Sequence, residues 1–120
     1  MNIDNLKSQM RKGMLEFCVL LLLRNRDAYA SEIISSMKEA HLIVMEGTLY
    51  PLLTRLKNDG LLAYRWEESP SGPPRKYYSL TPLGLQFLDQ LKSSWDEICL
   101  TVNHILLPSQ TPPPINPDEE

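Results

Sequence analysis

Hydrophobic positions recur at helical spacing through the first half of the chain and predict a series of helices. Residues 6–23 are apolar on nearly every face, with Gly13 as the weak point, so we expect one helix buried at the centre of a domain. A short amphipathic helix follows over about residues 30–40, where Ser31 supplies an N-cap hydroxyl. The next helix ends at Gly60, because glycine adopts the left-handed conformation that stops a helix at no steric cost.

The start of this third helix depends on Pro51, which has no backbone N–H to donate. A start near Gly47 or Thr48 places Pro51 in the first turn, where N–H groups have no intrahelical partner. The buried stripe of this helix consists of leucines, namely Leu49, Leu52, Leu53 and Leu56.

The pattern after Gly60 changes to two short segments rich in aromatic and apolar residues, which predict a β-hairpin. The segments are residues 61–66 and 75–80, and a Pro-rich loop over residues 69–74 joins them. Because proline restricts the backbone, we expect a stiff loop whose tip carries few side chains.

A long helix begins at Thr81–Pro82, where a capping hydroxyl precedes proline at the first helical position. Apolar residues then recur at alternating spacings of 3 and 4, which is typical of a seam that packs against another helix. The seam consists of Leu88, Leu91, Trp95, Ile98, Val102 and Ile105. We expect these residues to form a dimer interface, while Leu83 and Phe87 turn toward the domain.

These elements predict a mainly α-helical fold with a small β-hairpin, arranged as a winged helix-turn-helix followed by a long C-terminal dimerisation helix. We expect a DNA-binding domain over residues 1–81 and the dimerisation helix over residues 82–107. Residues 108–120 hold five of the ten prolines and end in three acids, so we expect a disordered tail.

The net charge of −3 does not suggest a nucleic-acid binder until the charges are divided by region. Residues 1–80 hold eleven Lys and Arg against nine Asp and Glu, a net charge of +2, whereas residues 81–120 carry a net charge of −5. Any basic face must therefore lie in the first two thirds of the chain.

The polar residues give no pattern typical of catalysis or metal binding. His41 and His104 have no acid or nucleophile at a catalytic spacing, and Cys18 and Cys99 lie within apolar helical patterns as expected of core thiols. We expect no enzyme activity, no cofactor and no metal. The apolar run over residues 17–23 is far shorter than the roughly 20 residues that span a bilayer, and no secretory signal is recognisable, so we expect a cytoplasmic protein without a membrane partner.

In a winged helix-turn-helix the third helix enters the major groove of double-stranded DNA and the hairpin reaches the neighbouring backbone. We expect base or phosphate contacts from the third helix and phosphate contacts from other basic residues. The candidate DNA-binding residues are Lys7, Arg11, Lys12, Thr48, Tyr50, Arg55, Lys57, Arg75 and Lys76. Two alternatives stay open: these charges are ordinary solvated groups, or the winged helix is a protein-interaction module without DNA binding.

Two segments resemble the signature segments of PadR-like transcriptional regulators. They are residues 46–56 (EGTLYPLLTRL) and residues 72–81 (GPPRKYYSLT), supported by residues 29–33 and 66–68. The similarity covers roughly residues 6–107 without a gap. Three positions depart from it. Met45 stands where a polar cap usually precedes the recognition helix, Ala30 replaces a common glycine before the second helix, and Gly84 stands where a better helix former is favoured.

The resemblance implies a homodimeric repressor that binds an inverted-repeat operator and responds to a small, usually aromatic effector. A single C-terminal helix is similar to the smaller subfamily, some members of which bind flat hydrophobic drugs between paired tryptophans at the dimer interface. Trp95 stands where that tryptophan is expected, which makes it the candidate effector-binding residue. A plain aromatic residue in the dimer core is the alternative for Trp95.

Overall fold

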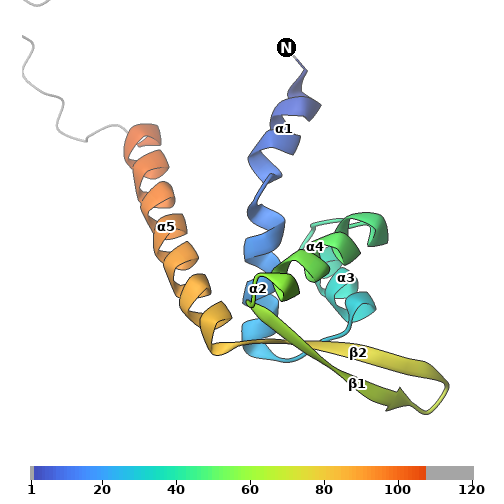
Figure 1. Cartoon of the computed structure of the whole chain (residues 1–120). Helices are drawn as coiled ribbons and strands as arrows, with labels where there is room; N and C mark the ends of the chain where they lie inside the picture. The colour runs from blue at the N-terminus through green and yellow to red at the C-terminus, as the bar shows by residue number, and fades with distance from the viewer. Residues whose placement is uncertain (1, 108–120) are drawn as a thin grey trace, which may run out of the picture.

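The computed structural model describes residues 2–107, which form five helices and one two-stranded antiparallel sheet (Figure 1). The expected tail, residues 108–120, lies outside the described residues. Within the described part, no helix is both long and apolar enough to cross a membrane. The elements in chain order are α1 (Ile3–Arg11), α2 (Met14–Asn25), α3 (Ala30–Glu39), α4 (Glu46–Asn58), β1 (Leu62–Ser69), β2 (Gly72–Leu80) and α5 (Pro82–Leu106).

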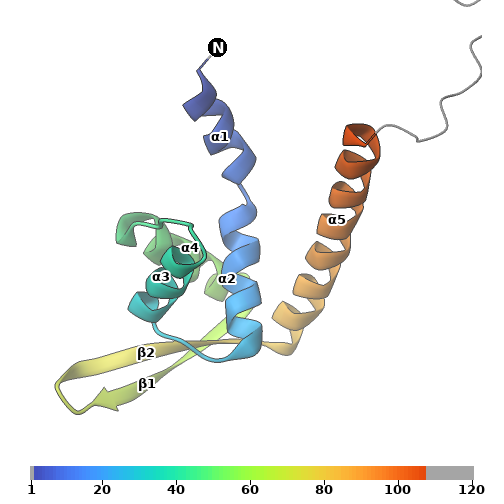
Figure 2. The same cartoon turned by 180° about the vertical axis from the view of Figure 1, so that it is seen from behind.

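Helix α2 is the centre of the core, because it lies between α5 on one side and α3 and α4 on the other (Figures 1 and 2). Its Val19 and Leu20 are fully buried, as are Ile33 of α3 and Leu49 and Leu53 of α4. The leucine stripe predicted for the third helix is buried as expected. This packing produces the helix-turn-helix of α3 and α4 with the hairpin beside it.

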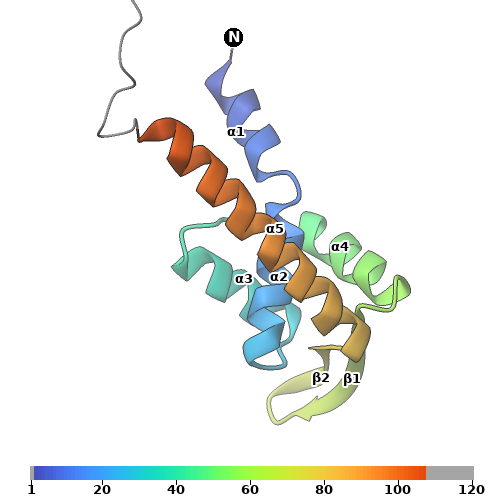
Figure 3. The ribbon, with the colours of Figure 1, turned by 90° about the vertical axis from the view of Figure 1, so that its left-hand side faces the viewer.

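The prediction of one helix over residues 6–23 is wrong, because the helix is interrupted at Lys12 and Gly13 and forms two separate helices. Gly13 has a φ of 87°, and the N–H of Lys12 donates to the carbonyl groups of Ser8 and Gln9 to close α1. Glycine adopts this left-handed conformation without steric cost, so Gly13 redirects the chain. Helix α1 then has no buried residue and projects from the domain on the side opposite the hairpin (Figures 1 and 3).

Two predicted helix starts also need correction. The N-cap of α3 is Tyr29, not Ser31, and the Glu32 carboxylate accepts a hydrogen bond from the Tyr29 N–H at 3.2 Å. Helix α4 begins at Glu46, so Pro51 lies inside the helix rather than in its first turn.

Helices α3 and α4 both end in a left-handed residue. Gly60 has a φ of 80°, and Leu61 donates back to the Leu56 carbonyl at 3.0 Å, as the predicted glycine stop requires. Helix α3 ends in the same left-handed conformation at His41, whose φ is 66° although it is not glycine. Leu42 there donates to the Met37 carbonyl at 2.8 Å.

The hairpin is longer and its turn tighter than the sequence predicts. Ser69 pairs with Gly72, so the expected loop over residues 69–74 shrinks to a two-residue turn and both Pro73 and Pro74 fall within β2. Neighbouring residues of a strand point their N–H groups to opposite edges, so one of the two prolines lies on the free edge of β2. The other faces β1 where the register shifts between Glu67 and Ser69, and neither proline is part of a regular pair there. Ala28 and Tyr78 exchange backbone hydrogen bonds of 3.2 and 2.8 Å, which join the hairpin to the segment before α3.

The predicted seam of α5 divides between the domain core and the surface. Leu88 is fully buried and Leu91 is packed against the core. These two residues therefore belong to the core of their own chain and do not face a second chain. Leu83 and Phe87, expected to face the domain, are exposed. The first half of α5 packs against α2, and this packing determines which face of α5 is buried (Figure 3).

Candidate nucleic-acid interface

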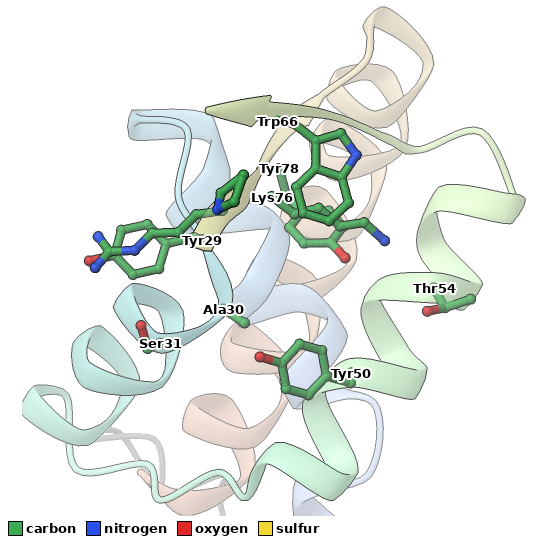
Figure 4. A pocket seen from close by; sticks show the side chains of 10 residues that line it. Tyr29, Ala30, Ser31, Tyr50, Thr54, Trp66, Lys76 and Tyr78 are labelled. Atoms are coloured by element: carbon green, nitrogen blue, oxygen red, sulfur yellow. The ribbon is translucent and has the colours of Figure 1, made fainter. Parts of the chain in front are cut away.

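A hollow of about 430 Å³ lies between the start of α3, the outer face of α4 and the hairpin (Figure 4). We call it the hairpin hollow. Aromatic and basic side chains dominate its lining, which includes Tyr29, Ser31, Tyr50, Thr54, Trp66, Arg75, Lys76 and Tyr78.

Helix α4 contributes Tyr50 and Thr54 to the hairpin hollow. Residues four apart share one face of a helix, and the leucines on the opposite face are buried, so both side chains must point out of the domain. The Tyr50 side chain remains 49% exposed and brings a phenol hydroxyl to this surface. These two residues can donate and accept hydrogen bonds at the face of α4 that a ligand would meet.

One face of the hairpin carries a ladder of cations and rings. The Arg75 guanidinium lies 4.4 Å from the centre of the Tyr29 ring, and Arg65 lies 5.3 Å from the centre of the Tyr77 ring. The two rings meet edge to face with centroids 5.1 Å apart. Arg65 also pairs with Asp27 and Glu67, and hydrogen bonds to these carboxylates raise its pKa. The ladder holds the hairpin against the start of α3.

The opposite face of the hairpin carries a second cluster, formed by Lys76, Tyr64 and Trp66. The Lys76 ammonium lies 4.4 Å from the Tyr64 ring centre and 5.4 Å from the Trp66 ring centre. The Lys57 ammonium of α4 lies 5.7 Å from the centre of the Tyr64 ring. Beneath them Tyr78 is buried, and this burial raises the pKa of its hydroxyl.

The charge of the hairpin hollow is available for a ligand. Among residues 2–107, neither Arg75 nor Lys76 forms an ion pair with a carboxylate. The first N–H groups of α3 have no intrahelical partner, and Ser31 lies at that end with an exposed side chain. Cations, free N–H groups and hydroxyls together suit an anionic ligand such as a phosphate.

A model of the transcriptional regulator PadR-like family matches residues 19–90, which run from α2 through the hairpin into α5. The chain belongs to the PadR-like family of transcriptional regulators. It is therefore a DNA-binding regulator with a winged-helix fold.

Solved structures of other PadR-like regulators agree with this fold. A PadR-like transcription factor from Bacteroides fragilis is 67% identical, with a TM-score of 0.72 and coverage of 84% of this chain and 98% of that one. A PadR-like regulator from Bacillus cereus is 37% identical, with a TM-score of 0.75 and coverage of 84% and 99%. A PadR family regulator from Eggerthella lenta is 34% identical, with a TM-score of 0.78 and coverage of 89% and 94%.

In this PadR-like protein the predicted DNA-binding residues divide between two surfaces. Tyr50, Arg75 and Lys76 meet in the hairpin hollow, whereas Lys57 does not line it and lies near the Tyr64 ring. A second hollow of about 610 Å³ lies between the α1–α2 break and the start of α4. It brings together four other predicted residues, namely Arg11, Lys12, Thr48 and Arg55.

Arg55 and Lys7 lie away from the hairpin hollow. The Arg55 guanidinium forms an ion pair with Glu16 of α2, on the side of α4 away from Tyr50. Lys7 lies on α1, which projects away from the hairpin. Neither residue shares the hairpin hollow with Arg75 and Lys76.

Seven residues of the hairpin hollow were not among the predicted site residues: Tyr29, Ala30, Ser31, Thr54, Trp66, Pro74 and Tyr78. Trp66 pairs with Lys76 across the hairpin, but a correctly placed turn at Ser69 and Gly72 would not predict this pairing, because the register shifts between Glu67 and Ser69. Tyr29 also has no signal in the sequence, since it meets Arg75 only after α3 and the hairpin have packed.

Trp95, the candidate effector residue, lies on α5 opposite α2. Its ring is 6.3 Å from the ring of Phe17 and is 39% exposed. Cys18 of α2 is half-buried, and burial raises the pKa of its thiol. Within residues 2–107, no group of three His, Cys, Asp or Glu side chains is arranged to hold a metal ion.

Proposed function

We propose that this PadR-like protein is a homodimeric repressor that binds an inverted-repeat operator through α4 and the hairpin. The hairpin hollow carries the proposal, because α4 side chains line it together with Arg75 and Lys76, neither of which pairs with a carboxylate among residues 2–107. Helix α4 would enter the major groove with Tyr50 and Thr54 near base edges, while Arg75 and Lys76 neutralise phosphates. Two copies related by a two-fold axis would place two α4 helices in successive major grooves.

The second half of α5 supports the proposed dimer. Ile98, Val102 and Ile105 are exposed on the same side of the helix as Trp95, and they have no partner within residues 2–107 that buries them. Burying these four side chains contributes about 6 kcal/mol per helix before the costs of association are subtracted. Helix α1 adds exposed Ile3 and Met10, and it projects in the same direction as this end of α5 (Figures 1 and 2).

Trp95 is the proposed contact for a planar aromatic effector. Its ring lies near the Phe17 ring, and the residue is partly exposed on the face of α5 that we assign to the dimer, so two copies would bring two Trp95 rings toward one another. A flat apolar molecule can stack between such rings, and it would change how the two DNA-binding halves are spaced.

The repressor proposal is tested by a mobility-shift titration on the DNA upstream of the protein's own gene, repeated at several salt concentrations with random duplex as competitor. We expect specific retention that weakens as salt rises, because phosphate contacts release counterions. Failure to retain that DNA even at low salt, together with co-purification of a partner protein, would favour an interaction module instead.

The effector proposal is tested separately by tryptophan fluorescence. Planar aromatic compounds should quench the native protein, and the quenching should disappear in Trp95→Ala but persist in Trp66→Ala. Quenching that survives Trp95→Ala would place the ligand elsewhere.

A further inference from the structure

Trp66 is a large apolar side chain that the fold leaves in water. Its side chain is 61% exposed, although it lies in the body of strand β1 and not at the hairpin turn. An exposed aromatic residue on an ordered strand gains little from the fold, since its apolar area stays hydrated. Its position on the wall of the hairpin hollow suggests that a ligand covers it.

The Trp66 ring faces the hairpin hollow, as do Tyr50 and Thr54 of α4. In Figure 4, Trp66 and Lys76 come from the hairpin on one side of the hollow, whereas Tyr50 and Thr54 come from α4 on the other. A helix inserted in the major groove is bounded on each side by a sugar–phosphate strand. A hairpin beside that helix must therefore meet the bounding strand, which would run through the hairpin hollow.

A sugar–phosphate strand has two chemical parts, an anionic phosphate and the apolar C–H face of the deoxyribose. The hairpin hollow offers a partner for each. Arg75 and Lys76 are unpaired cations among the described residues, and Trp66 is an exposed apolar surface next to one of them.

Trp66 and Tyr64 also restrict where the Lys76 ammonium can go. The two rings meet edge to face with centroids 6.3 Å apart, and Lys76 lies over both. A lysine on an open strand loses side-chain entropy when it binds a phosphate, and contacts made before binding reduce that loss. The aromatic pair therefore holds the ammonium beside the apolar ring before DNA arrives.

We propose that Trp66 is a DNA contact whose ring packs against a deoxyribose of the strand in the hairpin hollow, beside the phosphate that Lys76 binds. The proposal rests on the proposed function, because it requires α4 in the major groove. It assigns Trp66 a role independent of sequence, since every nucleotide carries the same sugar face.

The protein has two tryptophans, Trp66 and Trp95, which makes a direct test simple. Chains carrying Trp95→Phe or Trp66→Phe each retain one reporter, and each is titrated with a fluorescein-labelled duplex from the region upstream of the gene. Anisotropy of the label measures how much DNA is bound, and tryptophan emission is read in the same sample with an unlabelled duplex. We expect DNA to quench and shift the emission of Trp66 in the Trp95→Phe chain.

Unchanged Trp66 emission while anisotropy shows bound DNA would overturn this inference and leave the proposed function intact. Absence of DNA binding by the native chain would overturn both. An equal response of Trp95 in the Trp66→Phe chain would also contradict it, because the signal would then report a general change in the protein.

Salt dependence separates an apolar contact from an ionic one. Trp66→Ala should weaken binding about 5- to 10-fold at every salt concentration with no change in the salt slope, because no charge is lost. Lys76→Gln should instead reduce the slope by about 0.9. Trp66→Phe keeps a ring and should recover most of the affinity, and a thermal melt of each variant shows whether the hairpin still folds.

Discussion

The carbonyl oxygen of Leu61 lies so close to Gly84 that residue 84 cannot carry a Cβ atom without a clash. A Cβ atom added to Gly84 would lie 2.1 Å from that oxygen, far inside any normal contact. Thr81 fixes this approach, because its N–H donates to the Leu61 carbonyl at 3.1 Å and its hydroxyl donates to the Gly60 carbonyl at 2.6 Å. Gly84 is thus required where α5 crosses the turn between α4 and β1.

We predict that Gly84→Ala destabilises the protein by about 1–3 kcal/mol, since backbone must shift to relieve the overlap. Urea unfolding followed by circular dichroism measures the change. Gly47→Ala is the matched control, because Gly47 lies in α4 with no atom within 4 Å of an added Cβ. It should stabilise the fold by about 0.5–1 kcal/mol through helix propensity. Equal effects of the two substitutions would contradict this account of α5.

A glycine introduced at His41 should stabilise the protein, whereas the loss of the glycine at residue 84 should destabilise it. It holds a φ of 66° at the end of α3, a conformation that costs a residue with a Cβ roughly 1 kcal/mol. His41→Gly should therefore raise the free energy of unfolding by up to about 1 kcal/mol, although the greater freedom of glycine in the unfolded chain offsets part of the gain. His41→Ala keeps the Cβ and should bring no gain, and a stabilised alanine variant would show that the imidazole, not the backbone, is unfavourable.

The proposed dimer predicts a pair of contrasting glutamate substitutions on α5. Ile98→Glu should give a monomer and weaken operator binding, because it places a charge in the apolar face that we assign to the interface. Leu100 is more exposed than Ile98, at 71% against 55%, but lies on the opposite side of the helix. Leu100→Glu should leave the dimer intact. Sedimentation equilibrium measures both, and a dimeric Ile98→Glu protein would exclude this face.

The sequence predicted those features of the fold that depend on residues close together in the chain. Buried leucine spacing located α4, Gly60 located its end, and Thr81–Pro82 located the start of α5. Gly13 was read as a weak point in one helix, because a glycine inside an apolar pattern does not reveal its φ. The division of the α5 seam was missed for a related reason. Whether Leu88 faces its own core or another chain depends on the packing of α5 against α2, which periodicity does not contain.

The candidate site shows the same limit. Arg75 and Lys76 were predicted from charge beside a stiff hairpin, and the structure places both in the hairpin hollow. Tyr29 and Trp66 were not predicted as site residues, because their neighbours there come from other elements of the fold.

The central claim is that the hairpin hollow binds DNA phosphates. Its most direct test is the salt dependence of operator affinity for the native protein and for the Arg75→Ala, Lys76→Ala double variant. Lys92→Ala is the control, because Lys92 lies on α5 and pairs with Asp96 at 2.9 Å. We expect the double variant to bind more weakly and to lose about 0.9 from the salt slope for each phosphate contact removed, while the control matches the native protein. A double variant with native affinity and native slope at all salt concentrations would contradict the claim.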